Sequence, residues 1–356
     1  MDKEQTTLAS FLKTELQGIE AGVSLGNLLF NIAGICTEIA TMTAKGALAG
    51  ITGKLESQNV QGETQMRLDV LTNEIFISGL TDSGLVAGLV SEEMEDVHVI
   101  THSKEAKFLL AFDPLDGSSN VPVNVSVGSI FSILMAPENR MPEAKDFLQP
   151  GTQQVAAGYA LYGPVTMLVL TVGKGTHGFT LDPETKAFIL THQNMQVAQK
   201  TSEYAINASN ERFWEAPVIR YIDECKAGVE GKRERNFNMR WVASMVADVH
   251  RILLRGGVYL YPKDNKKPPR EGRLRLLYET NPMSMLIEQA GGKSSTGTQR
   301  MMDVVPDNIH QRIPVIIGTS EEVSLVERYT STFESGDVQI GDSPLFGERS
   351  LFHKGQ

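Results

Sequence analysis

The sequence predicts a layered α/β protein in which a helix-flanked sheet is followed by a smaller unit of alternating helices and strands. Two amphipathic helical patterns open the chain, a series of β-rich segments follows, and helical and strand patterns alternate from about residue 200. The length of 356 residues also exceeds what one hydrophobic core usually serves, so we expect two domains.

Helical periodicity is clearest near the N-terminus. Apolar residues recur at helical spacing over Thr6–Leu16, and more strongly over Ser24–Gly46, where Leu25, Leu29, Ile32, Cys36 and Ile39 share one face. A shorter third helix is predicted over Asp69–Gly79. These helices are expected to cover the first sheet.

Strand patterns follow, rich in Val, Ile, Leu and Phe and bounded by Gly, Pro or Asp turns. They are Leu85–Val90, Lys107–Phe112, Val123–Met135, Val155–Leu161 and Val165–Val172. A hairpin is predicted where Gly178–Leu181 and Ala187–Leu190 flank an Asp-Pro-Glu-Thr turn.

The second half alternates between the two periodicities. The predicted helices are Glu211–Lys226, Met239–Arg255, Met283–Ala290 and Glu321–Thr330, and the predicted strands are Val258–Tyr261 and Val315–Gly318. The change of pattern puts a domain boundary near residue 198, between domains 1–198 and 199–330. Residues 331–356 lack periodicity and are expected to form a tail.

Composition limits the possible partners. The net charge of −10 argues against a nucleic-acid partner, although local cations can still hold an anionic substrate. Two cysteines, Cys36 and Cys225, make neither a disulfide framework nor a zinc spacing. The N-terminus is polar, and no apolar run approaches the roughly 20 residues of a membrane helix. A cytoplasmic protein with no membrane partner is expected.

The sharpest motif is Phe112–Asn120, which reads FDPLDGSSN directly after a predicted strand. Asp113 and Asp116 can each be explained as ordinary turn residues. Together, however, they place two carboxylates at a strand end, where α/β sheets usually bind ligands. Gly117 and the polar residues that follow it offer donors suited to an anion.

Two further acidic segments accompany this motif. Glu92 and Glu93 follow a predicted strand, and a solvated acidic loop is the simpler interpretation of that segment alone. Glu63 precedes a predicted helix that Asp69 begins or caps. If these carboxylates converge, two of them about 4 Å apart repel by about 4 kcal/mol at an effective dielectric near 20. Oxygen ligands alone favour Mg²⁺ or Mn²⁺ as the ion that relieves this repulsion. The residues alone do not show that these carboxylates converge.

A resemblance supplies what the residues leave open. Between about residues 8 and 330 the chain resembles class I fructose-1,6-bisphosphatase, and in its detail the bacterial members of that family. The motifs that carry the likeness are Asn59–Glu63, Leu68–Leu71, Ser91–Glu93, Phe112–Asn120 and Gly272–Glu279, in this order. The resemblance implies the layered sugar-phosphatase fold, with two mixed sheets sandwiched by helices.

The resemblance also implies roles for individual residues. It makes residues 1–198 the metal-binding phosphatase domain and residues 199–330 the substrate-binding domain. The implied metal ligands for Mg²⁺, with Mn²⁺ as a substitute, are Glu63, Glu92, Asp113, Asp116, Glu279 and the backbone carbonyl of Leu115. Asp69 and Glu93 are implied to activate the attacking water.

The implied substrate is fructose 1,6-bisphosphate, hydrolysed at its 1-phosphate in gluconeogenesis or a related carbon cycle. The implied substrate contacts are Asp116, Gly117, Ser118, Ser119, Asn207, Arg240, Trp241, Tyr261 and Arg273. Taken alone, the two arginines are better explained as surface residues. In the family the position of Arg240 reaches a neighbouring subunit, so a homotetramer is expected.

Some positions depart from the family pattern. Arg273 replaces a common Lys, Trp241 and Asn210 stand where animal members have tyrosines, and Val121-Pro122 replaces an Ile-Asp pair. The segment Ile19–Ser24 does not match the AMP-binding segment of animal members, so AMP control of that type is not expected.

Three alternatives remain open. A sedoheptulose-1,7-bisphosphatase, alone or as a second activity, would use the same motifs. An inositol-monophosphatase-like enzyme would lack the second phosphate anchor, and a regulatory homologue would be inactive.

A glycine pattern at Gly173–Gly178 fits a dinucleotide fingerprint, but a strand and turn follow it instead of a helix. His250 is expected to be a structural histidine.

Overall fold

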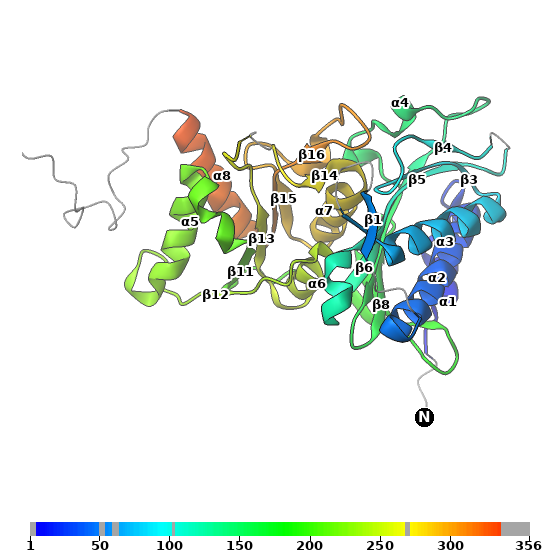
Figure 1. Ribbon diagram of the computed structural model, residues 1–356, viewed down its shortest axis with the longest axis horizontal. Coiled ribbons are helices and arrows are strands. Elements are labelled where there is room, and N and C mark those ends of the chain that lie inside the picture. Colours follow the sequence, from blue (N-terminus) through cyan, green and yellow to red (C-terminus); the bar gives the residue numbers. More distant parts are fainter. Residues whose placement is uncertain (1–4, 50–53, 59–63, 102–103, 268–270, 336–356) are drawn as a thin grey trace, which may run out of the picture.

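The computed structural model describes residues 5–49, 54–58, 64–101, 104–267 and 271–335. Its helices and strands lie in five layers, alternating between helices and sheets (Figure 1). Three N-terminal helices form one outer layer, and two helices of the second half form the other. Two mixed sheets enclose a middle layer of helices, so the predicted fold class is confirmed.

The first outer layer contains α1 (Leu8–Glu15), α2 (Gly22–Lys45) and α3 (Arg67–Ser83). Thr7 caps α1 by accepting a hydrogen bond from the backbone N–H of Ser10. The apolar faces of the three helices are buried against the first sheet in one hydrophobic cluster.

In the described residues, the first sheet has eight strands in the order β10-β9-β8-β7-β6-β5-β3-β4. Their bounds in chain order are Val86–Ser91, His98–Val99, Phe108–Asp116, Val127–Met135, Ala156–Tyr162, Thr166–Thr171, Thr176–Leu181 and Phe188–Met195, for β3 to β10. β3 and β5 are parallel, and the other described neighbours are antiparallel. Both faces of β5 and β6 are buried, since helices cover the sheet on either side.

The middle layer consists of α6 (Met245–Arg255) and α7 (Asn281–Gln289), which pack between the two sheets (Figure 1). A π-helical turn, η6 (Leu276–Thr280), leads directly into α7. The second sheet follows the order β12-β11-β13-β17-β15 in the described residues. Its strands, in that order, are Asn238–Met239, Glu203–Ile206, Val258–Tyr261, Val315–Gly318 and Lys293–Ser295.

The remaining elements are two outer helices, one short helix and two small strand pairs. The outer helices α5 (Ala216–Ala227) and α8 (Ser320–Glu334) cover the second sheet. A short helix, α4 (Ala144–Phe147), follows the first sheet's edge. Two small strand pairs are β1 (Lys54–Gln58) with β2 (Thr64–Met66), and β14 (Leu274–Arg275) with β16 (Arg312–Ile313). α8 extends into the predicted tail, of which residues 336–356 lie outside the described residues.

Three predicted element starts are wrong. The helix predicted from Met239 begins at Met245, because β12 occupies its first residues and Ser244 caps the helix with its side chain. The strand predicted from Val123 begins at Val127, after a 3-10 helix that contains Pro122. The helix predicted from Glu211 begins at Ala216, where Pro217 occupies the first turn.

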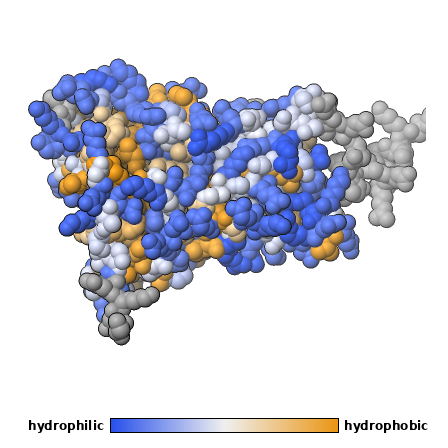
Figure 2. Space-filling view, turned by 180° about the vertical axis from the view of Figure 1, so that it is seen from behind, coloured by the Kyte–Doolittle hydropathy of each residue, from blue (hydrophilic) through white to orange (hydrophobic). Residues whose placement is uncertain are grey.

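By length and hydropathy, α2 could cross a membrane, contrary to the expectation that no apolar run is long enough. Half of its most apolar window is buried inside the protein, as in the core helix of a globular protein. Its outer side nevertheless exposes Val23 and Phe30. From behind, the surface of the protein is mostly hydrophilic, and its apolar areas gather on the half that holds the first sheet (Figure 2).

Candidate functional site

A bulge in β5 determines where its two aspartates point. Asp113 pairs with Ile130 and Asp116 with Gly128, so Ser129 of β6 stands opposite two residues of β5. Side chains three positions apart in a regular strand lie on opposite faces of the sheet, and one extra residue reverses that alternation. The bulge therefore brings Asp113 and Asp116 to the same face.

The packing of neighbouring residues confirms this shift. Phe112 belongs to the apolar cluster beneath α1, α2 and α3, and so does Leu115, three positions later. Pro114 is the extra residue, and because it has no N–H it leaves no ladder donor unpaired. The Asp-Pro-Leu-Asp spacing therefore places both aspartates on one face of the sheet only because the bulge adds a residue.

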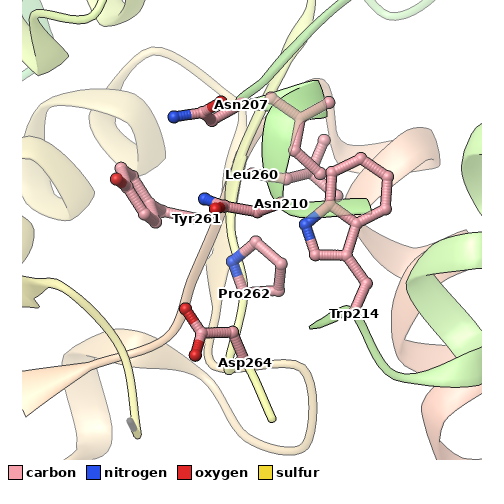
Figure 3. A pocket seen from close by; sticks show the side chains of 8 residues that line it. Asn207, Asn210, Trp214, Leu260, Tyr261, Pro262 and Asp264 are labelled. Atoms are coloured by element: carbon pink, nitrogen blue, oxygen red, sulfur yellow. The ribbon is translucent and has the colours of Figure 1, made fainter. Parts of the chain in front are cut away.

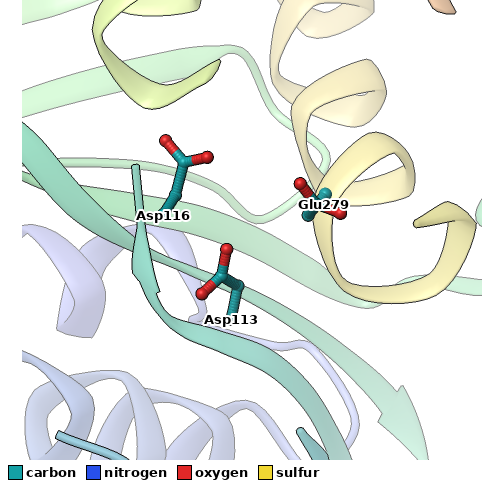
Figure 4. A group of neighbouring side chains, drawn as sticks. All are labelled: Asp113, Asp116 and Glu279. Carbon is teal, nitrogen blue, oxygen red and sulfur yellow. The ribbon is translucent and has the colours of Figure 1, made fainter. Parts of the chain in front are cut away.

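Glu279 completes a cluster of three buried carboxylates with Asp113 and Asp116 (Figure 4). One ligand oxygen from each lies within 4.8 Å of the others. Glu279 comes from the π-helical turn η6, and its Oε2 accepts a hydrogen bond of 2.6 Å from the backbone N–H of Arg275. The Oδ1 atom of Asp113 accepts one of 2.9 Å from the N–H of Leu115. A backbone N–H of its own segment therefore orients each of these two carboxylates.

Asp116 is held by the start of α6. Its Oδ2 accepts hydrogen bonds from the hydroxyl of Ser244 at 2.7 Å and from the N–H of Val246 at 2.9 Å. Both donors belong to the first turn of the helix, where free N–H groups favour a negative charge. Asp116 thereby joins the first sheet to the middle layer.

Burial dominates the electrostatics of the cluster. It raises the pKa of Asp113 well above the ordinary value, and the charges of Glu92, Asp116 and Glu279 raise it further. The pKa of Asp116 is raised mainly by burial, which its hydrogen bonds only partly offset. The pKa of Glu279 is raised well above the ordinary value by burial and by the charge of Glu92. Burial and mutual repulsion therefore both act against three negative charges in this cluster.

Glu92 lies beside this cluster with a partner that the sequence did not suggest. The guanidinium of Arg275, itself buried, lies 3.1 Å from the carboxylate of Glu92. The N–H of Glu92 donates to the carbonyl of Phe112, so the turn after β3 is fastened to β5. Glu92 therefore lies in a charged network and not in the solvated loop that its segment alone suggests.

The two predicted catalytic residues lie on linked elements. Asp69 is buried in the first turn of α3, and Glu93 is half-buried after β3. Ser91 joins the two elements, because its hydroxyl donates to Asn73 of α3 and accepts from the N–H of Glu93. The predicted ligand Glu63 lies outside the described residues.

The donor set fits a divalent cation. Buried carboxylate oxygens at this spacing repel one another unless a proton or a cation lies between them, and oxygen ligands without His or Cys suit Mg²⁺ or Mn²⁺. The structure thus brings together Asp113, Asp116 and Glu279, with Glu92 beside them, from segments far apart in the chain.

A small pocket opens at the carboxyl ends of β11 and β13 (Figure 3). Its lining residues are Ile206, Asn207, Asn210, Trp214, Leu260, Tyr261, Pro262 and Asp264. The predicted contacts Asn207 and Tyr261 therefore lie in one pocket. Asn207 is held in place at the start of its loop, because its Oδ1 accepts hydrogen bonds from the N–H and hydroxyl of Ser209.

Cations surround the buried carboxylate of this pocket. Arg273 lies 3.7 Å and Lys266 4.0 Å from Oδ2 of Asp264. The Nζ of Lys266 also donates to Oδ1 of Asn210 at 2.7 Å. The Nε of Arg273 is buried without a hydrogen-bond partner. The pocket is therefore lined by amide, hydroxyl and carboxylate groups, and two cations lie against its Asp264.

Trp241 and Arg240 occupy neighbouring but different surroundings. The indole ring of Trp241 stacks on Tyr259, with centroids 5.6 Å apart, and meets the edge of Tyr261. The half-exposed side chain of Arg240 lies 3.9 Å from Glu203 and does not line the pocket. Within one chain, neither residue lines the pocket, but Trp241 packs against its Tyr261 whereas Arg240 lies beside Glu203.

The remaining predicted contacts follow β5 directly. Gly117 has a φ of 76°, a conformation that favours glycine, and a Cβ atom there would lie 2.7 Å from Cβ of Ser244. Ser118 and Ser119 begin the 3-10 helix that follows, with Ser119 exposed. The glycine thus turns the chain next to the capping residue of α6.

Sequence reasoning missed Arg275, Ser244, Asp264 and Lys266. For Arg275 a signal was present, because it alternates with Arg273 just before Glu279. The two discounted motifs are confirmed as structural. His250 lies 2.8 Å from the hydroxyl of Tyr159, and the glycine pattern joins β8 to β9 without a helix.

Comparisons with known proteins agree with this geometry. Residues 6–193 match the family described as fructose-1-6-bisphosphatase, N-terminal domain, and residues 197–331 match its C-terminal domain. The chain is 52% identical over 351 residues to fructose-1,6-bisphosphatase class 1 3 of Methylibium petroleiphilum, covering 98% of each chain. It is 50% identical over 354 residues to fructose-1,6-bisphosphatase class 1 of Methylacidiphilum infernorum, covering 99% of each.

A solved structure shows the same arrangement. Fructose-1,6-bisphosphatase of Leishmania major in its holo form aligns with a TM-score of 0.86 at 37% identity. The alignment covers 92% of this chain and 100% of that one. The likeness thus extends over both sheets and the helices between them.

Proposed function

The chain belongs to the fructose-1,6-bisphosphatase family, and from this premise we propose that it hydrolyses the 1-phosphate of fructose 1,6-bisphosphate to fructose 6-phosphate and phosphate. The observation that carries the proposal is that one chain holds both parts such a substrate requires. A cluster of buried carboxylates suits a cation-assisted phosphatase site, and a separate pocket whose Asp264 lies beside two cations suits a second phosphate. The reaction would serve gluconeogenesis or a related carbon cycle.

Mg²⁺ is the proposed cofactor, with Mn²⁺ as a substitute. Asp113, Asp116, Glu279 and Glu92 would hold it, joined by Glu63 and the carbonyl of Leu115. A bound divalent cation would lower the pKa of water and neutralise charge on the phosphoryl oxygens and on the departing sugar oxygen. The raised pKa values of the cluster support this proposal, since protons occupy the carboxylates when no cation does.

Asp69 and Glu93 are the proposed acceptors of the water proton. The water oxygen bonds to phosphorus while the bond from phosphorus to the sugar O1 oxygen breaks. The sugar oxygen leaves as an alkoxide, which takes up a proton from solvent, and the carboxylate releases the proton of the water to solvent, so no net proton is lost or gained. The hydrogen bonds of Ser91 would keep the turn that carries Glu93 at a fixed position relative to α3.

The substrate would lie between two anion sites. Gly117, Ser118 and Ser119 would surround the 1-phosphate, beside Asp116. Asn207, Tyr261 and Arg273 would hold the 6-phosphate, with Trp241 packed against the aromatic wall. Lys266 joins this set as a second cation, which the buried carboxylate of Asp264 holds close to Arg273.

Arg240 would act on a neighbouring active site in a homotetramer. Support comes from its position, since its half-exposed side chain lies outside the pocket of its own chain. A cytoplasmic location is proposed as well, because the two cysteines are free and buried.

The test is phosphate release from fructose 1,6-bisphosphate, sedoheptulose 1,7-bisphosphate and inositol 1-phosphate, each with Mg²⁺ and with EDTA. Fast, EDTA-sensitive release from the first substrate alone is expected. Comparable release from the second would show a dual activity, and release from the third would contradict the need for a second phosphate. Release from none would establish an inactive homologue.

The phosphate pocket can be tested separately. Lys266→Met should raise the KM for fructose 1,6-bisphosphate about tenfold, because one charge-assisted contact is lost. Lys263→Met is the matched control, since Lys263 lies in the same loop and pairs with Glu271. An equal effect of both substitutions would contradict the assignment of Lys266.

A further inference from the structure

Two buried hydrogen bonds link β7 to the bulge of β5. The hydroxyl of Ser129 donates to the carbonyl of Pro114 at 2.7 Å. The same hydroxyl lies 2.8 Å from the hydroxyl of Tyr162 on β7. Tyr162 is packed in the same apolar cluster as Cys36 of α2. Nothing in the proposed reaction uses these groups.

The number of available protons determines which group donates in each of these hydrogen bonds. A carbonyl accepts only, so the single proton of Ser129 goes to Pro114, and Tyr162 must donate to Ser129. The proton of Tyr162 is then engaged with Ser129. Burial raises the pKa of Cys36 to about 12 and that of Tyr162 well above its ordinary value, so both keep their protons at neutral pH.

These hydrogen bonds end at the bulge of β5, where they fix one carbonyl group. Ser129 is the residue of β6 that faces two residues of β5, and its bond to Pro114 occupies the carbonyl of the extra residue. That carbonyl belongs to the peptide bond between Pro114 and Leu115, whose N–H donates to Asp113. Ladder pairing is disrupted at a bulge, so a side chain supplies the bond that regular pairing would give.

We infer that Ser129 and Tyr162 are positioning residues, which hold the bulge of β5 in the shape that lets its two aspartates share one divalent cation. The inference rests on the metal site of the proposed function. Neither side chain reaches the carboxylates, because both lie on the face of the sheet that packs against α2. They act through the peptide group of Pro114. Loss of the Ser129 hydroxyl frees that carbonyl, and loss of the Tyr162 hydroxyl removes the donor that orients Ser129, so either loss widens the range of carboxylate geometries.

The strand that carries Tyr162 offers a matched control. Tyr159 lies on the same strand, is equally buried, and faces the opposite side of the sheet. Its hydroxyl lies 2.8 Å from Nδ1 of His250. Tyr159→Phe therefore removes a buried tyrosine hydroxyl without touching the bulge.

The experiment measures Mn²⁺ binding by electron paramagnetic resonance, on the full chain without substrate. Ser129→Ala and Tyr162→Phe should each weaken Mn²⁺ binding about tenfold, the effect typical of residues that orient metal ligands. Ser129→Thr keeps the hydroxyl and should restore the affinity. Tyr159→Phe should bind Mn²⁺ as the wild type does. Thermal unfolding in EDTA shows that each variant is folded.

Unchanged Mn²⁺ affinity in Ser129→Ala and Tyr162→Phe would overturn the inference, and so would an equal loss in Tyr159→Phe. If Ser129→Ala does not fold, Tyr162→Phe decides, because phenylalanine fills the same space. Phosphate release by the wild-type protein separates this result from the proposed function. Absent fructose 1,6-bisphosphate hydrolysis would refute the function, while the pattern of Mn²⁺ affinities would still decide the role of the two hydroxyls.

Discussion

Replacement of Asp113 by asparagine separates the charge of the acidic cluster from its shape. The Oδ1 atom of asparagine can still accept the hydrogen bond from Leu115, so the bulge should persist. Two full charges 4.8 Å apart repel by about 3.5 kcal/mol at an effective dielectric near 20. Protonation already relieves part of this repulsion in the metal-free protein. Asp113→Asn should therefore stabilise the metal-free fold by about 1–3 kcal/mol at neutral pH.

The dependence on pH gives this prediction a signature. The pKa values of Asp113, Asp116 and Glu279 are raised in the folded protein, so it binds more protons than the unfolded chain above about pH 4. Stability that is fully present below the unfolded pKa is lost as the pH rises through the folded pKa. Asp113→Asn removes one such group. The gain in stability of Asp113→Asn over the wild type should be absent near pH 4 and grow toward neutral pH.

The assay is urea unfolding in EDTA and in excess Mg²⁺, at several pH values, with phosphate release measured in parallel. Mg²⁺ should stabilise the wild type and have much less effect on Asp113→Asn, whose turnover should fall by orders of magnitude. A variant less stable than the wild type in EDTA at neutral pH would refute the electrostatic reasoning. Near-normal turnover would refute the assignment of the site.

Three other predictions concern the surrounding structure. Gly117→Ala should destabilise the fold by about 1–3 kcal/mol in urea unfolding, because alanine at a φ of 76° is strained and its Cβ meets Ser244. Glu322→Gln should cost about 3 kcal/mol and leave Mn²⁺ binding unchanged, because Arg233 loses its buried counter-charge. Both cysteines should react with a disulfide reagent only after unfolding, since burial raises each thiol pKa to about 12; a fast reaction of the native protein would contradict this.

The sequence predicted those parts of the fold that local patterns determine. Helical periodicity located α2 and α3, and apolar runs between turn residues located the strands of the first sheet. It misplaced the start of α6, because Ser244 caps the helix inside a segment whose periodicity already resembled a helix. Periodicity reports the face that a helix would bury, but not the residue at which its hydrogen bonds begin.

The site was predictable as a set of motifs and not as a geometry. Asp113 and Asp116 stood out through their spacing, yet a regular strand would have turned them to opposite faces. The bulge that reverses this depends on a serine in the next strand. Glu279 approaches through a π-helical turn, for which the sequence carries no plain signal. Lys266 was missed because its role depends on Asp264, whose burial is a tertiary property.

The carboxylates of the site come from both halves of the chain. Asp113 and Asp116 belong to the first sheet, whereas Glu279 and the cap of α6 come from the middle layer, which is translated later. Domains of a growing chain generally fold from the N-terminus onward. The first sheet can thus be complete on the ribosome while its metal site still lacks a ligand. Tight metal binding therefore requires the two halves to be packed together, and a growing chain does not yet hold the complete metal site.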